Sequence, residues 1–386
     1  MNQCRFEDRL NQRARVLTGP CGRIVAHTAE ELESVFLKID AARQQGYWIA
    51  LLLEYELGEW LEPALARTAR PRSGSGFGSA GHKHPRLTAL VFEHMQEQRP
   101  WSVGAEAASE STAAITAVRA GITKQTYLTR IQQIREWIAQ GEVYQINSTF
   151  PLMVDTQGDP AQLYRQIANR HPVAHAAYIE DAGRTVLSFS PELFLQRTGN
   201  TLITRPMKGT APRSPDPDTD RRLGEALHAS EKNRAENLMI VDLLRNDLGR
   251  LALPGSVRAD PLFSLEKYPS VWTMTSTIQA DIASETSFAE ILRALFPCGS
   301  VTGAPKIAAM KRIQETEPEP RGIYCGSLGW LAPNGDFSLN VAIRTLVLDE
   351  HGNGRYHVGG GIVYDSDPEQ EWDECHWKAR ILGASV

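Results

Sequence analysis

An apolar stripe at helical spacing begins just after residue 124 and stops before Gly141, a residue that commonly ends helices. Its members are Tyr127, Ile131, Ile134 and Ile138. The pattern therefore predicts an amphipathic helix that ends near Gly141.

The period of the pattern changes to two in residues 143–150, as in a strand with one polar face. The polar face carries Gln145, Asn147 and Thr149, and the other face carries Tyr144, Ile146, Ser148 and Phe150. We therefore expect Gln145 to lie where it can reach a cavity.

A β-hairpin is predicted by two short apolar runs, 193–195 and 202–204, on either side of the turn signal Gly199-Asn200. It ends at the segment Pro206–Thr210, which places Lys208 sixteen residues after Glu192. A lysine amine is a poor nucleophile while it is protonated, and a nearby carboxylic acid can protonate a departing hydroxyl. Taken alone, Lys208 is better explained as a solvated loop lysine, and the remaining motifs reverse that interpretation.

The remaining patterns mix amphipathic helices with long antiparallel strand runs, which predicts an α+β fold with sheets covered by helices. An Arg-, Gly- and Ser-rich stretch, 66–85, indicates a loop. Helices are expected near 220–228, 232–248 and 288–295. Two more are expected, one with Pro305 in its first turn and one that begins near Pro368. Strands are expected at 47–53, 87–92, 185–190, 323–331, 337–348 and 356–364.

Composition excludes several classes of protein. The 386 residues carry a formal net charge of −5, which gives no basic surface for nucleic acid. No apolar signal segment opens the chain, and the longest apolar run, Trp48–Leu53, is too short to span a bilayer. The five cysteines are widely scattered and match neither a disulfide framework nor a zinc pattern, so a reducing cytoplasm fits best. No Walker or GxGxxG nucleotide pattern is present.

Acidic residues in two segments are candidate metal ligands. Glu371, Glu374 and Lys378 share one face of the last predicted helix, which a solvated face with one ion pair would also explain. Glu236 lies on or beside the apolar face of its helix, where a carboxylate must be paired or bound to a metal. A buried pair with an arginine is as good an interpretation for Glu236. Carboxylates without His or Cys suit Mg²⁺.

Two further features indicate a bound ligand. Three glycines, 359–361, interrupt a predicted strand and are typical of close approach by a ligand or another backbone. If Gly335 is left-handed in a three-residue loop, Ala332 pairs with Asp336 and Tyr324 falls opposite Arg344. Arg344 is then a candidate carboxylate clamp, although an ordinary cross-strand pair is the alternative.

Together these segments resemble one family. Residues 123–382 are similar to the chorismate-utilising enzymes, and most closely to their aminodeoxychorismate synthase branch, which serves para-aminobenzoate and folate synthesis. The resemblance rests jointly on Ser190–Glu192, Pro206–Thr210, 234–249, Thr302–Lys306, 324–327, 343–345, 359–363 and the helix with Glu371, Glu374 and Lys378.

Two positions separate the branches of this family. Anthranilate synthases carry Ala where Lys208 stands, and isochorismate and salicylate synthases carry a water-activating lysine where Gln145 aligns. The combination of Lys208 and Gln145 points to the aminodeoxychorismate branch. At Thr273 this chain departs from relatives, which often have a His there.

The resemblance implies two packed antiparallel sheets flanked by helices, with 1–118 an N-terminal segment of the same fold and 119–384 the chorismate-binding catalytic region. It also implies amination of chorismate at C4 to 4-amino-4-deoxychorismate. By analogy Lys208 attacks C2 while Glu192 protonates the departing C4 hydroxyl, and ammonia then displaces the lysine.

Further expectations follow from the same resemblance. Mg²⁺ would be held by Glu236, Glu371 and Glu374. The substrate would be held by Gln145, Gly209, Thr210, Tyr324, Arg344, Gly359, Gly360, Gly361 and Lys378. Neither Cys21 nor Cys325 lies on the G-x-C-x-G elbow of a glutaminase, so ammonia would come from a separate glutamine amidotransferase subunit. The alternatives are an anthranilate synthase component I, an isochorismate synthase, or a non-catalytic subunit that binds a partner.

Overall fold

The computed structural model describes residues 3–66, 84–102, 113–268 and 271–383, so most of the loop expected at 66–85 lies outside the described residues. The described strands form one sheet of seventeen strands and a smaller sheet of three, and every strand pair is antiparallel. The large sheet contains β1 (Cys4–Asp8), β2 (Arg13–Ala26), β3 (Trp48–Leu53), β4 (Leu87–Gln98), β5 (Ala114–Ala120), β6 (Gln145–Gln157), β7 (His175–Asp181), β8 (Arg184–Ser190), β9 (Leu193–Thr198), β10 (Thr201–Arg205), β12 (Arg258–Ala259), β15 (Ile278–Asp281), β16 (Gly303–Ala304), β17 (Ser327–Leu331), β18 (Phe337–Asn340), β19 (Thr345–Asp349) and β20 (Asn353–Ile362). The small sheet contains β11 (Met207–Pro212), β13 (Ser264–Lys267) and β14 (Val271–Thr275).

Strand β1 joins two halves of the large sheet because it pairs with β2 on one side and β7 on the other. From β2 the pairing runs through β4, β3, β17, β18, β9, β10 and β15 to β12. From β7 it runs through β8, β19, β20 and β6 to β5. The architecture confirms the α+β prediction of antiparallel sheets flanked by helices.

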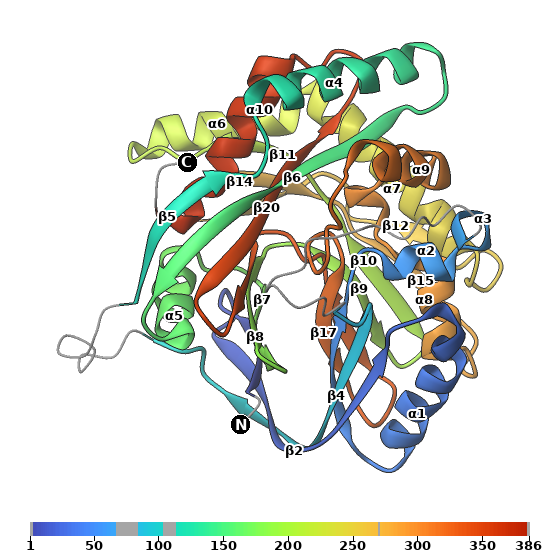
Figure 1. The fold of residues 1–386 in the computed structure, drawn as a ribbon. Coiled ribbons are helices and arrows are strands. Elements are labelled where there is room, and N and C mark those ends of the chain that lie inside the picture. Colours follow the sequence, from blue (N-terminus) through green and yellow to red (C-terminus); the bar gives the residue numbers. More distant parts are fainter. Residues whose placement is uncertain (1–2, 67–83, 103–112, 269–270, 384–386) are drawn as a thin grey trace.

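Helices cover the sheets on the outside (Figure 1). Helices α4 and α10 lie together along β6 and β20, whereas α1, α2 and α8 gather beside the other half of the sheet. Helix α9 packs on β6 and β16. The helices are α1 (Leu32–Gln44), α2 (Leu57–Leu61), α3 (Pro63–Ala66), α4 (Lys124–Ala139), α5 (Pro160–Arg170), α6 (Pro217–Ala229), α7 (Glu231–Gly249), α8 (Phe288–Leu295), α9 (Lys306–Thr316) and α10 (Pro368–Ala379). Within the described residues, no helix is both long and apolar enough to cross a membrane.

Aromatic packing fixes α10 against β6. Trp372 of α10 stacks on Phe150 of β6 with ring centroids 5.3 Å apart, and Tyr127 of α4 contacts both rings. Tyr127 and Phe150 are fully buried, as the helical and alternating patterns predicted. These contacts hold α10 against the Phe150 face of β6, which is opposite the face that carries Gln145.

Most predicted elements are confirmed, and the differences are local. Pro305 is the N-cap of α9 and not its first-turn residue. Ala332 and Asp336 pair as predicted, with Gly335 left-handed at φ +91°. The long strands expected at 323–331 and 337–348 are shorter, because Cys325 and Arg344 adopt positive φ angles and end the regular pairing.

Candidate active site

Lys208 lies at a β-bulge. Its strand β11 pairs with β14, but the register shifts between Met207 and Thr210, so Lys208 and Gly209 interrupt the ladder. Gly209 has φ +88°, a conformation that glycine adopts without strain. The hydroxyl of Thr273 on β14 donates to the carbonyl oxygen of Gly209 at 3.3 Å. Thr273 therefore supports the bulge from the neighbouring strand, and bulges of this kind redirect side chains beside functional sites.

The surroundings of Lys208 favour its neutral form. Burial lowers the pKa of Lys208, and the charge of Lys378 lowers it further, while Glu192 has the opposite effect. A lysine with a lowered pKa has a larger fraction of free amine, which is the nucleophilic form. These surroundings therefore favour a role for Lys208 as a nucleophile over its interpretation as a solvated loop lysine.

Glu192 is suited to donate a proton. It follows β8 in the Ser190–Glu192 segment and is only 4% exposed. Burial raises the pKa of Glu192 to about 6, despite the opposing effects of a hydrogen bond from Ser300 and the charge of Lys208. A carboxyl group with this pKa stays partly protonated near neutral pH, as a general acid requires.

Ser300 is a functional candidate that the sequence reasoning missed. Its hydroxyl donates to Glu192 Oε1 at 2.7 Å and lies 3.2 Å from the sulfur of Cys298. Ser300 lies two residues before Thr302–Lys306, one of the segments that carry the family resemblance. Its position beside that segment is the sequence signal that could have identified it. Lys306 of that segment has a structural role, because its amine pairs with Asp247 on α7 at 2.5 Å.

The three glycines of β20 lie against the candidate site. A Cβ atom on Gly360 would lie 2.9 Å from Glu371 Oε2, and one on Gly361 would lie 2.5 Å from Gln145 Nε2. Gly359 presents its carbonyl oxygen to the amine of Lys378 at 2.7 Å. The absence of a side chain at Gly360 and Gly361 therefore lets polar side chains from β6, β11 and α10 approach the strand closely.

The candidate metal ligands occupy two helices. Glu371 accepts a hydrogen bond from Ser366 at 2.7 Å, and Glu374 pairs with Lys378 at 2.7 Å. Burial raises the pKa of Glu371, with further contributions from Glu374 and Glu236. Burial also acts to raise the pKa of Glu374, but the Lys378 pair lowers it overall.

The carboxylates fit a hydrated Mg²⁺ ion. Mutual repulsion of Glu236, Glu371 and Glu374 is the situation that a bound cation relieves. In the described part of the chain, no three acidic, His or Cys side chains converge closely enough to enclose an ion by themselves. Mg²⁺ commonly keeps several waters and takes only one or two carboxylates, so this arrangement is compatible with it.

Tyr324 and Arg344 do not form the cross-strand pair that we expected, and that prediction is wrong. Tyr324 lies in a turn before β17, and Arg344 lies between β18 and β19, each beside or at a positive-φ residue. Tyr324 instead stacks on His357, with ring centroids 5.3 Å apart. The Arg344 side chain is half-buried and makes no hydrogen bond or ion pair with any described residue, so it is free to bind a carboxylate.

The sequence pattern of the chorismate binding enzymes matches residues 1–383. The chain belongs to this family. Its sequence is 39% identical over 303 residues to the aminodeoxychorismate synthase component 1 of Klebsiella aerogenes, a match that covers 78% of this chain and 67% of that relative. The resemblance to the aminodeoxychorismate synthase branch is thereby confirmed.

Other chorismate binding enzymes are similar to comparable degrees. The anthranilate synthase component 1 of Streptomyces coelicolor is 40% identical over 270 residues, covering 69% of this chain and 52% of that relative. The crystal structure of anthranilate synthase component I from Streptococcus pneumoniae has the same fold, with a TM-score of 0.82 and 21% identity over 97% of this chain and 92% of that one. Because overall identity is so close for the two activities, the residues of the site must distinguish them.

Proposed function

We propose that this enzyme aminates chorismate at C4 to give 4-amino-4-deoxychorismate, with ammonia supplied by a separate glutamine amidotransferase subunit. The observation that supports it best is a lysine with a lowered pKa at the position where anthranilate synthases carry Ala. The similarity to aminodeoxychorismate synthase component 1 sequences supports the same branch.

The reaction would proceed in two displacements. The neutral amine of Lys208 forms a bond to C2 of chorismate, the ring double bonds shift, and the C4–O bond breaks. Glu192 gives its proton to the departing C4 oxygen, which leaves as water. Ammonia then forms the C4–N bond, the double bonds shift back, and the C2–N bond to Lys208 breaks. The lysine nitrogen keeps its positive charge until the C2–N bond breaks, so Lys208 leaves as the neutral amine. The new ammonium group at C4 then loses one proton, which restores Glu192.

Other residues of the chain would hold the substrate. Arg344 offers an unpaired guanidinium for one carboxylate, and Tyr324, Gly209, Thr210, Lys378 and the glycines of β20 complete the proposed contacts. Glu236, Glu371 and Glu374 would hold Mg²⁺, which supplies Lewis-acid polarisation and orientation of the ring carboxylate. The free cysteines fit the proposed cytoplasmic location.

Product analysis tests this proposal directly. The purified chain is incubated with chorismate, Mg²⁺ and an ammonium salt, with and without an added glutaminase and glutamine, and the products are separated by chromatography. Aminodeoxychorismate as the main product supports the proposal. Anthranilate or isochorismate as the main product would overturn it in favour of another branch, and the absence of any product would favour a non-catalytic subunit.

A further inference from the structure

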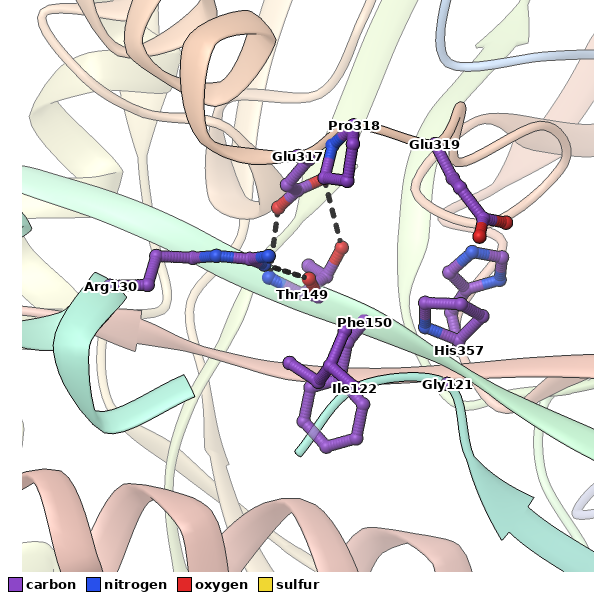
Figure 2. A pocket seen from close by; sticks show the side chains of 10 residues that line it. Gly121, Ile122, Arg130, Thr149, Phe150, Glu317, Pro318, Glu319 and His357 are labelled. Carbon is purple, nitrogen blue, oxygen red and sulfur yellow. Dashed lines mark hydrogen bonds between the residues drawn. The ribbon is translucent and has the colours of Figure 1, made fainter. Parts of the chain in front are cut away.

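A small cavity of about 70 Å³ lies between α4, β6, β20 and the loop that follows α9. Figure 2 shows its polar lining, with Arg130 of α4 reaching toward Thr149 of β6 and with Glu317 near the same threonine. His357 and Glu319 line the cavity as well. The cavity contains none of the proposed catalytic or metal-binding residues.

The carboxylate of Glu317 is fully used by other partners. It accepts two hydrogen bonds from the guanidinium of Arg321, at 2.7 and 2.8 Å. It accepts two more from Thr149, at 2.9 Å from the backbone nitrogen and 3.1 Å from the hydroxyl. A carboxylate offers about four acceptor positions, so Glu317 has none left for Arg130. Glu317 and Arg321 therefore neutralise each other.

This pairing leaves Arg130 as an excess positive charge inside the protein. Arg130 is 7% exposed, and its single hydrogen bond is a donation to the carbonyl oxygen of Thr149 at 2.8 Å. No carboxylate of the described residues forms an ion pair with it. Burial lowers the pKa of Arg130, although the charge of Glu317 opposes that effect. A buried guanidinium without a counter-ion is unfavourable, and four of its five N–H donors remain available.

The other polar groups of the cavity do not compensate the charge. The other carboxylate of the lining, Glu319, pairs with Arg355 at 2.9 Å. His357 is 7% exposed and stacks on Tyr324, and its ring nitrogens have no hydrogen-bond partner among the residues that the structure describes. Burial lowers the pKa of His357 to about 3, so the ring is neutral and presents one N–H donor. The lining thus offers unused donors from Arg130 and His357. Its two carboxylates are each paired with an arginine outside the lining, so Arg130 is the charge of the cavity that has no ion-pair partner among the described residues.

We propose that this cavity binds a small monovalent inorganic anion, chloride being the one expected, with Arg130 as its principal ligand. The volume decides the class of ligand, because one water occupies about 30 Å³ of liquid. The cavity accepts a chloride ion with one or two waters and excludes a molecule as large as chorismate. Bound chloride supplies the missing counter-charge and holds α4 to β6. The inference does not depend on the proposed function.

Melting temperatures test the proposal in solution. The full chain is melted in sodium chloride and in sodium gluconate of equal ionic strength, because gluconate is too large for the cavity. Chloride at about 100 times its Kd should raise the melting temperature by several degrees relative to gluconate. Arg130→Gln should lose this difference, and Arg130→Lys should keep part of it. Arg135→Gln is the matched control, because it removes an equal charge from the same helix at a half-exposed residue that donates to the Tyr364 carbonyl oxygen. This variant should keep the whole difference in melting temperature between chloride and gluconate.

Bromide provides a second measurement that needs no variant. Crystals of the wild-type protein grown in bromide should show an anomalous scattering peak beside the Arg130 guanidinium. Equal chloride responses in wild type and Arg130→Gln would overturn the proposal. So would a wild-type map without bromide in the cavity, and that result decides the matter even if the Arg130 variants fail to fold.

Discussion

The side-chain amide of Gln145 and the amine of Lys208 converge on Gly361. A Cβ atom on that glycine would lie 2.5 Å from Gln145 Nε2 and 3.5 Å from Lys208 Nζ. Gln145 is 3% exposed, and its Nε2 atom has no hydrogen-bond partner in the described part of the chain. Because a neutral amide cannot take a proton from water, Lys208 is the only nucleophile that this pair of side chains offers.

Adding a methyl group at Gly361 should therefore impair catalysis more than folding. In Gly361→Ala the new Cβ meets the flexible ends of two side chains, which can move aside but lose their relative positions. We expect kcat to fall about tenfold or more, with a small change in melting temperature. In the matched variant Gly359→Ala the Cβ meets the backbone of Ser148, which cannot move, so the melting temperature should fall as well. A fully active Gly361→Ala enzyme would contradict this expectation.

Lys208→Ala should remove most ammonia-dependent formation of aminodeoxychorismate. Loss of the nucleophile should lower kcat by about 100-fold or more. The remaining activity should be a slow, anthranilate-like reaction in which ammonia attacks directly. Mass spectrometry of the wild-type protein incubated with chorismate but without ammonia should show an adduct on Lys208. An unmodified Lys208 together with a fully active Ala variant would exclude the covalent route.

The pH dependence of kcat/KM should follow Glu192. Burial raises the pKa of Glu192 to about 6, so its acid form is present below that pH and is lost above it. If protonation of the leaving oxygen limits the rate, kcat/KM should decline as pH rises through about 6, since this ratio reports the free enzyme. Glu192→Gln should abolish that dependence and lower kcat by about 10²-fold or more.

Ser300 provides the control for this assignment. Its hydrogen bond to Glu192 lowers the pKa of the carboxyl group, so Ser300→Ala should raise that pKa and move the decline to higher pH. A purely structural role for Ser300 would change the melting temperature without moving the pH profile.

Local sequence signals predicted the elements whose boundaries are set locally. Helix α8 has the predicted bounds because Ser287 and Glu290 form a capping box at its start. The hairpin of β9 and β10 turns at Gly199 and Asn200 as expected, with Gly199 at φ +58°. The family and its fold were also predictable, since several short motifs agree jointly.

Features that depend on tertiary contacts were not predictable. The positive φ angles of Cys325 and Arg344 have no sequence signal, because neither is a glycine or an asparagine, and they broke the predicted pairing of Tyr324. The hydrogen bond from Ser300 to Glu192 joins residues 108 positions apart. The roles assigned to Glu236, Glu371 and Glu374 stay a prediction, since helical spacing relates two of them but says nothing of the third.

Removal of Mg²⁺ should stop the reaction if the three carboxylates share one ion. Each of the variants Glu236→Gln, Glu371→Gln and Glu374→Gln should need more Mg²⁺ for half-maximal activity. The required Mg²⁺ concentration should rise about tenfold or more for each lost ligand. Glu369 and Asp373 are exposed acids of α10 outside this set, so Glu369→Gln and Asp373→Asn are matched controls that should leave the requirement unchanged. Titration of chelator-treated enzyme with Mg²⁺ measures the effect, and full activity after chelation would refute the metal assignment.

The last prediction concerns Gln145, whose position decides which group can attack C2. A lysine at this buried position could activate water if burial or a nearby cation lowered its pKa, whereas the amide cannot. With the competing amine removed, the double variant Gln145→Lys/Lys208→Ala should divert some chorismate to isochorismate, which carries the new hydroxyl at C2. The measurement is chromatography of the products formed with Mg²⁺ and without ammonia, with Lys208→Ala alone as the control that should form none. Circular dichroism and the melting temperature establish that the double variant is folded. A folded double variant that yields no 2-hydroxy product would show that Gln145 does not face C2 of the bound substrate.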